Sequence, residues 1–209
     1  MKQLMADGRT IMARYGDIRN FFDTHRIIGR QIADIRPFLM DYRVRFMDEF
    51  DDIEDAEQML MFTAIQTDGQ VCIVFENGDS CEVEIPGEAP IILGLNTVDW
   101  SQYPVYDGSC YSLRTMFRGI VGRTVTEVRI VQTDSRMEFP SYCGIDMSED
   151  DEGVRSIQWV LDDGTYIEFE GSVDWFCVGH YTADGGDVYI PLAELWKEMD
   201  EHSIFEMFE

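Results

Sequence analysis

The sequence predicts an α+β fold made by tandem duplication of one unit, in which a β-hairpin-containing antiparallel sheet is backed by a helix. Three observations predict it: a hairpin-like stretch occurs twice, a strand-like stretch precedes each copy, and amphipathic helical patterns flank the copies. We place the first unit at residues 17–110, with an N-terminal helix at residues 1–26, and the second at residues 111–209, with a C-terminal helix. A pseudo-two-fold axis is expected to relate the units.

The hairpin pattern appears in residues 73–84 (IVFENGDSCEVE) and again in residues 159–170 (WVLDDGTYIEFE). Asn77-Gly78 in the first stretch aligns with Asp163-Gly164 in the second, and apolar residues alternate with polar ones on both sides. These dipeptides favour tight turns between antiparallel strands because glycine adopts positive φ without strain. Each stretch is therefore predicted to form a hairpin.

A strand-like stretch lies upstream of each hairpin. Residues 28–36 (IGRQIADIR) match residues 121–129 (VGRTVTEVR). Both stretches begin with an apolar residue, Gly and Arg and end with an acid, an apolar residue and Arg, and Ile28, Ile32 and Ile35 align with Val121, Val125 and Val128. The spacing of the apolar positions is typical of a half-buried strand. The alternative interpretation is that such patterns belong to hairpin proteins in general. Three matching blocks in the same order favour duplication.

Helical patterns flank the strand-like stretches. The spacing i, i+3, i+4, i+7 of an amphipathic helix occurs twice, and a shorter stripe lies near the N-terminus. Pro191 suits the first turn of the last helix. The apolar positions are Ile18, Phe21 and Phe22; Leu113, Met116, Phe117 and Ile120; and Leu192, Leu195, Trp196 and Met199.

The hairpin turns predict which residues share a face of the sheet. A two-residue turn at Asn77-Gly78 would pair Val74 with Cys81 on an apolar core face. The opposite face would then carry apolar residues beside two glutamates in each copy: Ile73 and Phe75 with Glu82 and Glu84, and Trp159 and Leu161 with Glu168 and Glu170. One interpretation is a sheet face partly covered by a helix, with the glutamates at its rim. The other is a partner-binding face.

The charge distribution is strongly negative and uneven. The formal net charge is −25, from 16 basic and 41 acidic residues. Residues 1–47 carry nine Lys/Arg against five Asp, so the acidity belongs to the rest of the chain. This sign argues against direct binding to nucleic acid. The N-terminal arginines are expected to pair with carboxylates of this chain or of a second copy: Arg9, Arg14, Arg19, Arg26, Arg30, Arg36, Arg43 and Arg45.

Two acidic segments lie at equivalent places, between the strand-like stretch and the hairpin of each copy. They are either solvated faces or spaced negative charges that imitate a phosphate backbone toward a basic partner. Neither has the spacing of a calcium-binding loop. The candidate partner-binding residues are Asp48, Glu49, Asp51, Asp52, Glu54, Asp55 and Glu57 in the first segment, Glu149, Asp150, Asp151 and Glu152 in the second, and Glu82, Glu84, Glu168, Glu170 and Trp159 on the hairpins.

Catalytic and cofactor signatures are missing from the sequence. It contains no H-E-x-x-H, G-x-S-x-G, G-x-G-x-x-G or G-K-[ST] motif, so we predict no enzyme, no cofactor and no metal. A Cys–His pair from Cys177 or Cys143 with His180 is formally possible. We expect instead a buried thiol and a hydrogen-bonded core histidine, because Cys177 and His180 lie in an apolar run.

Location follows from composition. No run of about 18 apolar residues occurs, and the five cysteines form neither a zinc pattern nor a disulfide framework. We expect a cytoplasmic protein with reduced thiols and no membrane partner.

The sequence thus predicts a non-enzymatic acidic protein that binds and inhibits a basic, nucleic-acid-handling partner. In charge and size alone it resembles nucleic-acid mimics, anti-CRISPR proteins and toxin immunity proteins. One alternative is a structural or homodimeric interaction module whose acidity serves solubility. A hydrolase with an unrecognised Cys or carboxylate site is the third.

Overall fold

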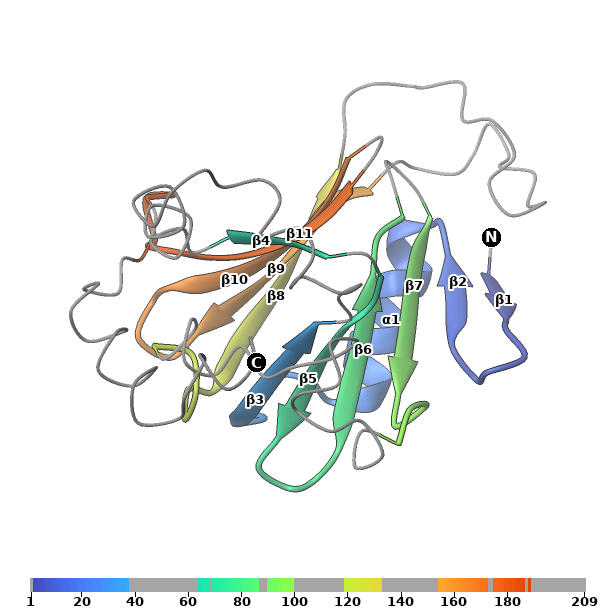
Figure 1. The fold of residues 1–209 in the computed structure, drawn as a ribbon, viewed down its shortest axis with the longest axis horizontal. Helices are drawn as coiled ribbons and strands as arrows, with labels where there is room; N and C mark the ends of the chain where they lie inside the picture. Colours follow the sequence, from blue (N-terminus) through green and yellow to red (C-terminus); the bar gives the residue numbers. More distant parts are fainter. Residues whose placement is uncertain are drawn as a thin grey trace, which may run out of the picture.

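The chain folds as two antiparallel sheets and one helix within the residues that the computed structural model describes: 2–37, 64–67, 69–86, 90–99, 119–132, 154–172, 175–186 and 188 (Figure 1). The fold is therefore α+β and mostly β. The first sheet has the order β1 (Lys2–Leu4), β2 (Thr10–Met12), β7 (Ile91–Leu95), β6 (Ser80–Glu84), β5 (Val71–Phe75) and β3 (Ile32–Pro37). The second has the order β4 (Ala64–Thr67), β11 (Trp175–Tyr181), β10 (Tyr166–Ser172), β9 (Val154–Leu161) and β8 (Val125–Gln132).

The helix predicted at residues 1–26 is wrong in its first half, because the N-terminal residues form a strand pair before the helix begins. Helix α1 spans Tyr15–His25, whereas β1 and β2 pair with each other and β2 also pairs with β7. The turn between β1 and β2 contains Gly8 at a φ of 91°, with the Met5 amide donating to the Arg9 carbonyl at 2.7 Å. Glycine permits this left-handed backbone, and the strand pair extends the sheet by two strands.

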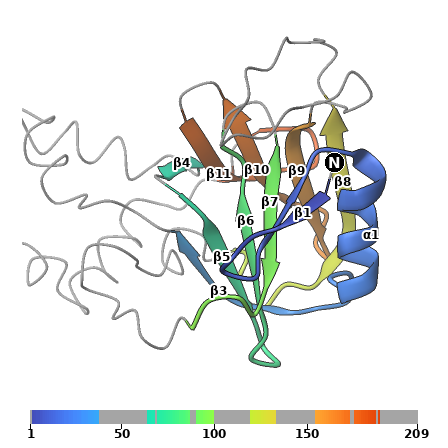
Figure 2. The same cartoon turned by 90° about the vertical axis from the view of Figure 1, so that its right-hand side faces the viewer.

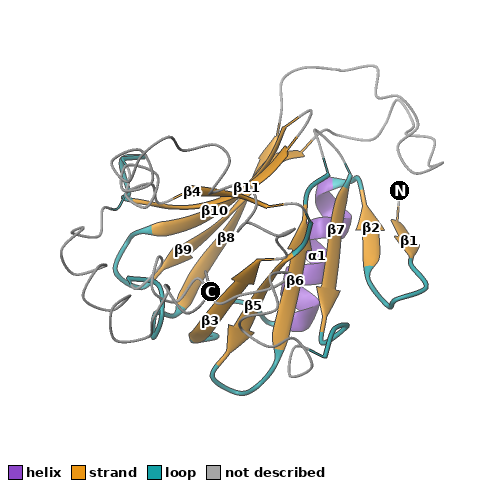
Figure 3. Cartoon of the chain, viewed as in Figure 1, coloured by secondary structure: helices purple, strands orange, loops and turns teal. Residues whose placement is uncertain are grey.

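Helix α1 covers one face of the first sheet and lies behind β6 and β7 in the view of Figure 3. Its buried side chains are Ile18, Phe21 and Phe22, which is the apolar stripe that the sequence predicts. The helix ends at Arg26, which has a left-handed φ of 50°, and the Ile27 amide donates back to the Phe22 carbonyl. The other predicted helices, at residues 113–120 and 191–199, lie outside the described residues except for Gly119 and Ile120, which lie in a turn.

The β5–β6 hairpin has a three-residue turn, so the predicted two-residue turn is wrong. The Phe75 amide donates to the Asp79 carbonyl at 2.8 Å, and Gly78 lies at a φ of 84°. Ile73 therefore pairs with Cys81, and not Val74 as expected. Because side chains alternate between faces, this shift by one residue exchanges the predicted cross-strand neighbours.

The β9–β10 hairpin has the same turn, with the Leu161 amide donating to the Thr165 carbonyl at 2.8 Å and Gly164 at a φ of 86°. The predicted faces are wrong in both hairpins. The apolar residues Ile73, Phe75, Trp159 and Leu161 are buried in the core, and the glutamates Glu82, Glu84, Glu168 and Glu170 belong to the opposite, outer faces.

Strands β3 and β8 are the edge strands at which the two sheets meet. Gly29 donates its amide hydrogen to the Val125 carbonyl, and Gly122 donates to the Ile32 carbonyl, both at 2.8 Å. An antiparallel bridge between Gln31 and Thr124 lies between these bonds. Just after this contact each edge strand has a one-residue register shift against its neighbour, β3 against β5 and β8 against β9, and β8 has a second shift near its end. The matching stretches of sequence therefore make matching local structure.

The inner faces of both sheets and α1 share one hydrophobic core, and Figure 2 shows the helix beside β8. Trp159 lies at the centre of this core. Its ring contacts Phe75 of the first sheet, Phe22 of α1 and Phe169 of its own sheet at centroid distances of 5.3–6.1 Å. The outer face of the first sheet carries two small apolar clusters, Ile11 with Ile92 and Cys72 with Val74, beside its polar residues.

Candidate partner-binding surface

The two acidic segments lie outside the described residues, so the structure places none of their eleven candidate carboxylates. The five hairpin candidates are described. Trp159 is fully buried in the core, which corrects the expectation that it shares a surface with the glutamates. The four glutamates lie on the outer faces of the two sheets, each with hydrogen-bond partners from this chain.

Glu82 is a buried carboxylate on the outer face of the first sheet, with no exposed surface. Its Oε1 accepts a hydrogen bond from the Ser80 hydroxyl at 2.7 Å, and its Oε2 accepts one from the Thr97 hydroxyl at 2.8 Å. Directly opposite on β7 is Gly94, where an added Cβ would lie 2.5 Å from Glu82 Oε2. The close packing and the neutral donors satisfy this carboxylate inside the protein.

Glu84, two residues along β6, forms an ion pair with Arg9 at 2.6 Å. The Arg9 guanidinium also pairs with Asp7 at 2.8 Å and donates to the Gln70 side chain. The hydrogen bonds and charges of Asp7 and Glu84 raise the pKa of Arg9 despite the partial burial that opposes this. The negative charge of Glu84 is therefore balanced within the first sheet.

Glu168 occupies the position in the second sheet that Glu82 has in the first: it lies opposite Gly179, as Glu82 lies opposite Gly94. Its Oε1 accepts hydrogen bonds from the Ser156 hydroxyl at 2.6 Å and the Gln158 amide at 3.0 Å. Unlike Glu82 it is half-buried. No described ion pair includes Glu168, so its charge remains unbalanced by any cation in the described part of the chain.

Glu170, further along β10, pairs with Arg155 at 2.8 Å. Arg155 is largely exposed, with 65% of its side chain accessible, so this ion pair is surrounded by water and contributes little to stability. Of the four glutamates, only Glu168 combines partial exposure with neutral partners alone.

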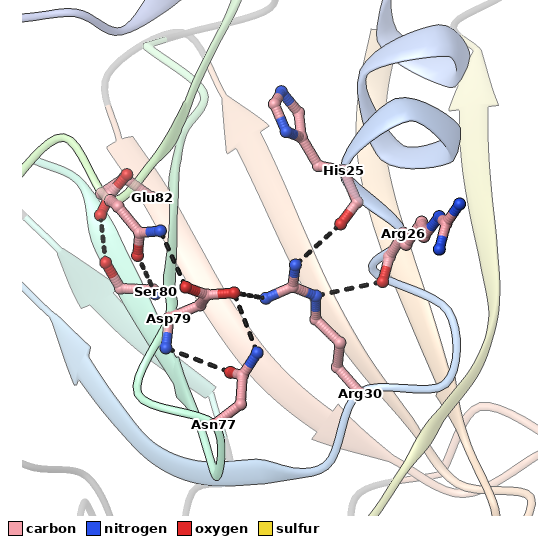
Figure 4. Close-up of polar contacts among 8 residues, drawn as sticks. His25, Arg26, Arg30, Asn77, Asp79, Ser80 and Glu82 are labelled. Atoms are coloured by element: carbon pink, nitrogen blue, oxygen red, sulfur yellow. Dashed lines mark hydrogen bonds and ion pairs between the residues drawn. The ribbon is translucent and has the colours of Figure 1, made fainter.

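The arginines of the N-terminal third pair with carboxylates of this chain, as the sequence predicts, at Arg9, Arg19, Arg30 and Arg36. Figure 4 shows Arg30 between the end of α1 and the β5–β6 turn. Its guanidinium donates to the His25 and Arg26 carbonyls and to Asp79, the last at 2.6 Å. Hydrogen bonds from Asn96, Arg30 and Asn77 lower the pKa of Asp79. Arg43 and Arg45 lie outside the described residues.

Cys177 and His180 lie on opposite faces of β11, and the thiol is only half-buried, not buried as expected. Cys177 lies on the outer face of β11, whereas His180 is 3% exposed and points inward, where its Nε2 lies 2.9 Å from the Thr165 hydroxyl. Burial raises the pKa of Cys177 to about 12 and lowers that of His180 to about 4. The expected hydrogen-bonded core histidine is confirmed. Cys143 lies outside the described residues.

The Asp163–Thr165–His180 chain is a polar feature that the sequence pattern does not reveal. Asp163 accepts a hydrogen bond from the Thr165 hydroxyl at 2.7 Å and pairs with Arg123 at 3.2 Å. A Thr two residues after Asp in a turn is the only local signal, because His180 comes from another strand. This chain stabilises the turn of the second hairpin.

Metal and membrane features are not found in the described part of the chain. No group of three or more His, Cys, Asp or Glu side chains there is arranged to hold a metal ion. No helix among those residues is long and apolar enough to cross a membrane.

The net charge divides unequally between the described framework and the remaining segments. The described residues contain 10 Lys/Arg and 15 Asp/Glu, a net charge of −5. The other residues contain 6 Lys/Arg and 26 Asp/Glu, a net charge of −20. Most of the acidic residues therefore belong to parts of the sequence outside the described residues.

Comparisons with protein-family models, with curated proteins and with solved structures found no match to this chain.

Proposed function

We propose that this chain is a non-enzymatic binding protein whose acidic segments block a basic, nucleic-acid-handling partner. The observation that carries the proposal is the division of charge: −5 on the described framework and −20 on the remaining residues. A single-sign field of this size speeds the encounter with a basic surface and opposes the approach of nucleic acid.

We also infer that the chain is a tandem duplication whose two units are related by a pseudo-two-fold axis. Four correspondences support this: the reciprocal Gly29–Val125 and Gly122–Ile32 hydrogen bonds, the equal register shifts at the start of β3 and β8, the identical three-residue turns, and the Glu–Gly cross-strand pairs. Strands β3-β5-β6-β7 would then correspond to β8-β9-β10-β11.

The duplication bears on function through the acidic segments. Residues 48–57 follow β3 in the sequence, and residues 149–152 follow β8, before β9 begins. Under the proposed symmetry the two segments leave equivalent strands. Two related acidic segments on one framework would present paired negative charge to a partner that ordinarily binds the two strands of a duplex.

The experiment is a pull-down with the full chain in which recovered proteins are tested for release by salt and by duplex DNA. We expect a nucleic-acid-binding protein that about 0.5 M salt releases, because charges are screened within a few Å at that ionic strength. Added duplex DNA should compete for it. A variant with six changes, Asp48→Asn, Glu49→Gln, Asp51→Asn, Asp52→Asn, Glu54→Gln and Asp55→Asn, should lose the partner while keeping the circular dichroism spectrum of the parent.

The matched control removes six exposed framework carboxylates and so makes the same change in net charge: Asp7, Asp23, Glu76, Glu127, Asp162 and Asp184, each replaced by its amide. This variant should keep most of its affinity. Equal loss in both variants would reduce the proposal to a general charge effect. Undiminished binding by the segment variant would refute it, and a salt-resistant dimer with no partner would favour a structural module.

A further inference from the structure

The outer faces of the two sheets differ at equivalent positions, and the difference centres on Glu168. In the first sheet Glu82 is covered: Thr97, just beyond the end of β7, donates its hydroxyl to the carboxylate, and the next residue, Val98, packs against Cys72. Cys72 is the cross-strand neighbour of Glu82 on β5. The chain that leaves β7 thus closes over this part of the first sheet.

In the second sheet the described residues that follow β11, 182–186, form a turn of their own and donate no hydrogen bond to Glu168. Thr182 is the counterpart of Thr97 in the first sheet. Each threonine lies three residues after the glycine that is opposite the glutamate, Gly179 and Gly94 respectively. Its hydroxyl instead lies 2.6 Å from Asp184 Oδ1 and 3.0 Å from the Gly186 amide, within the turn at residues 182–186. Glu168 therefore lacks the threonine cap of Glu82, and only its Oε1 has hydrogen-bond partners among the described residues.

Two tyrosines flank the uncapped carboxylate. Tyr166 precedes Glu168 by two residues on the same face of β10, and its ring stacks on that of Tyr181, with centroids 5.5 Å apart and planes inclined by 30°. Gly179 is the residue opposite Glu168, and the Tyr181 ring lies over it. A Cβ added to Gly179 would lie 2.5 Å from that ring. Both tyrosines are half-buried, as is Gln158 across from Glu168.

The electrostatics of this face favour a cation. Burial and the charge of Glu168 raise the pKa of the Tyr166 phenol, which agrees with a carboxylate close to the ring. Arg129 lies near Tyr166 but is already paired with Glu127 at 2.8 Å. A planar guanidinium can stack on tyrosine while donating to a carboxylate oxygen, a combination that a lysine ammonium cannot reproduce in the same geometry.

We propose that Tyr166, Tyr181 and Glu168 form a site for the guanidinium group of an arginine side chain on the basic partner. The identity of the occupant rests on the proposed function, in which the partner is basic. The chemistry of the site rests on the second sheet alone. Glu168 supplies the negative charge that its neutral hydrogen-bond donors leave unbalanced, and the tyrosine pair supplies the stacking surface.

The test uses the full chain labelled with ¹³C in its tyrosine rings and an acetylated, amidated tetra-arginine peptide as the probe. The peptide should shift the ring signals of Tyr166 and Tyr181, and a tetra-lysine peptide of equal charge should bind more weakly. Glu168→Gln and Tyr166→Leu should each weaken arginine-peptide binding by roughly three- to tenfold. Tyr166→Phe, which keeps the ring, should retain binding.

The control is Glu76→Gln, which removes one exposed carboxylate from the turn of the first hairpin. It should change the affinity by less than about twofold, since no tyrosine pair accompanies it. Equal weakening by Glu76→Gln and Glu168→Gln, or unshifted signals of both tyrosines, would overturn the arginine site. The proposed function is tested separately by the six-residue segment variant: partner binding that depends on that segment but not on Glu168 would leave the function standing without this site.

Discussion

Phe75 on β5 and Trp159 on β9 stack across the core, with ring centroids 6.0 Å apart and planes inclined by 16°. Each residue lies near the end of the first strand of its hairpin, and the two hairpins belong to different sheets. Phe22 of α1 meets the Trp159 ring edge-on at 6.1 Å. One aromatic cluster therefore joins both sheets and the helix, so the sheets are expected to unfold together.

Trp159→Ala should lower the free energy of unfolding by about 3–5 kcal/mol, the usual cost of removing a large buried aromatic side chain. Urea denaturation followed by circular dichroism measures this change. Trp159→Phe is the control: it retains a ring and removes the indole N–H, which has no hydrogen-bond partner among the described residues, so it should cost less than about 2 kcal/mol. Similar small losses in both variants would mean that the cluster does not hold the sheets together.

Gly94→Ala should destabilise the protein by roughly 2–4 kcal/mol, because the new methyl group would displace a buried hydrogen-bonded carboxylate. Its Cβ would lie 2.5 Å from both Glu82 Oε2 and Thr97 Oγ1. Thermal denaturation of the two variants provides the comparison. Gly16→Ala in α1 meets no atom within 4 Å and should be neutral or slightly stabilising. A Gly94 variant as stable as the Gly16 variant would argue against the packing around Glu82.

The sequence predicts the two hairpins, because local patterns determine them, but it predicts strand at residues 28–31 and 121–124, where the structure has turns before β3 and β8. Gly78 and Gly164 adopt positive φ in the predicted hairpin turns, and Gly29 and Gly122 adopt it in the turns that the sequence does not predict. The register could not be predicted, since glycine after Asn or Asp suits both a two-residue turn and a three-residue turn with a bulge. A two-residue turn and a three-residue turn differ in which backbone groups bond across the turn. This difference shifts the strand pairing by one residue and so changes which residues of the two strands share a face of the sheet.

The candidate site was less predictable than the fold. The burial of Glu82 depends on Thr97, which is 15 residues away in the sequence and reaches the carboxylate only after β7 has paired with β6. The matching glutamate of the second sheet, Glu168, is half-buried, because Thr182 bonds within its own turn. Local alternation predicts that each glutamate lies on the same face of its own sheet as its neighbours two residues away, but it does not determine which residues cover that face.

Asp79→Ala should lower the free energy of unfolding by roughly 1–2 kcal/mol, since Arg30, Asn96 and Asn77 would lose a charged acceptor that is partly exposed. Urea denaturation measures the loss. Asp162→Ala, which removes a more exposed carboxylate 3.9 Å from Arg123, should change stability by less than about 0.5 kcal/mol. Equal effects would show that the Arg30 contacts add nothing to an ordinary surface charge.

Stability should fall as the pH is lowered from about 6.5 to about 4, and His180 should account for part of the fall. Burial lowers the pKa of His180 to about 4 in the folded protein, against an ordinary value of 6.5. Asp163 opposes the shift and Arg123 adds to it. Between these two pH values the unfolded chain binds the proton more tightly, so acid favours unfolding. The difference corresponds to at most about 3 kcal/mol, fully present above pH 6.5 and lost near pH 4.

The His180 contribution can be separated from general acid effects by comparing the parent with His180→Gln, whose amide can still reach the Thr165 hydroxyl. Urea denaturation at several pH values between 4 and 7 gives the free energy of unfolding for both proteins. The parent should lose more stability than the variant across this interval, although the variant starts lower because its side chain fills the core less well. Parallel pH profiles would mean that His180 keeps an ordinary pKa and that its imidazole is not held neutral beside Thr165.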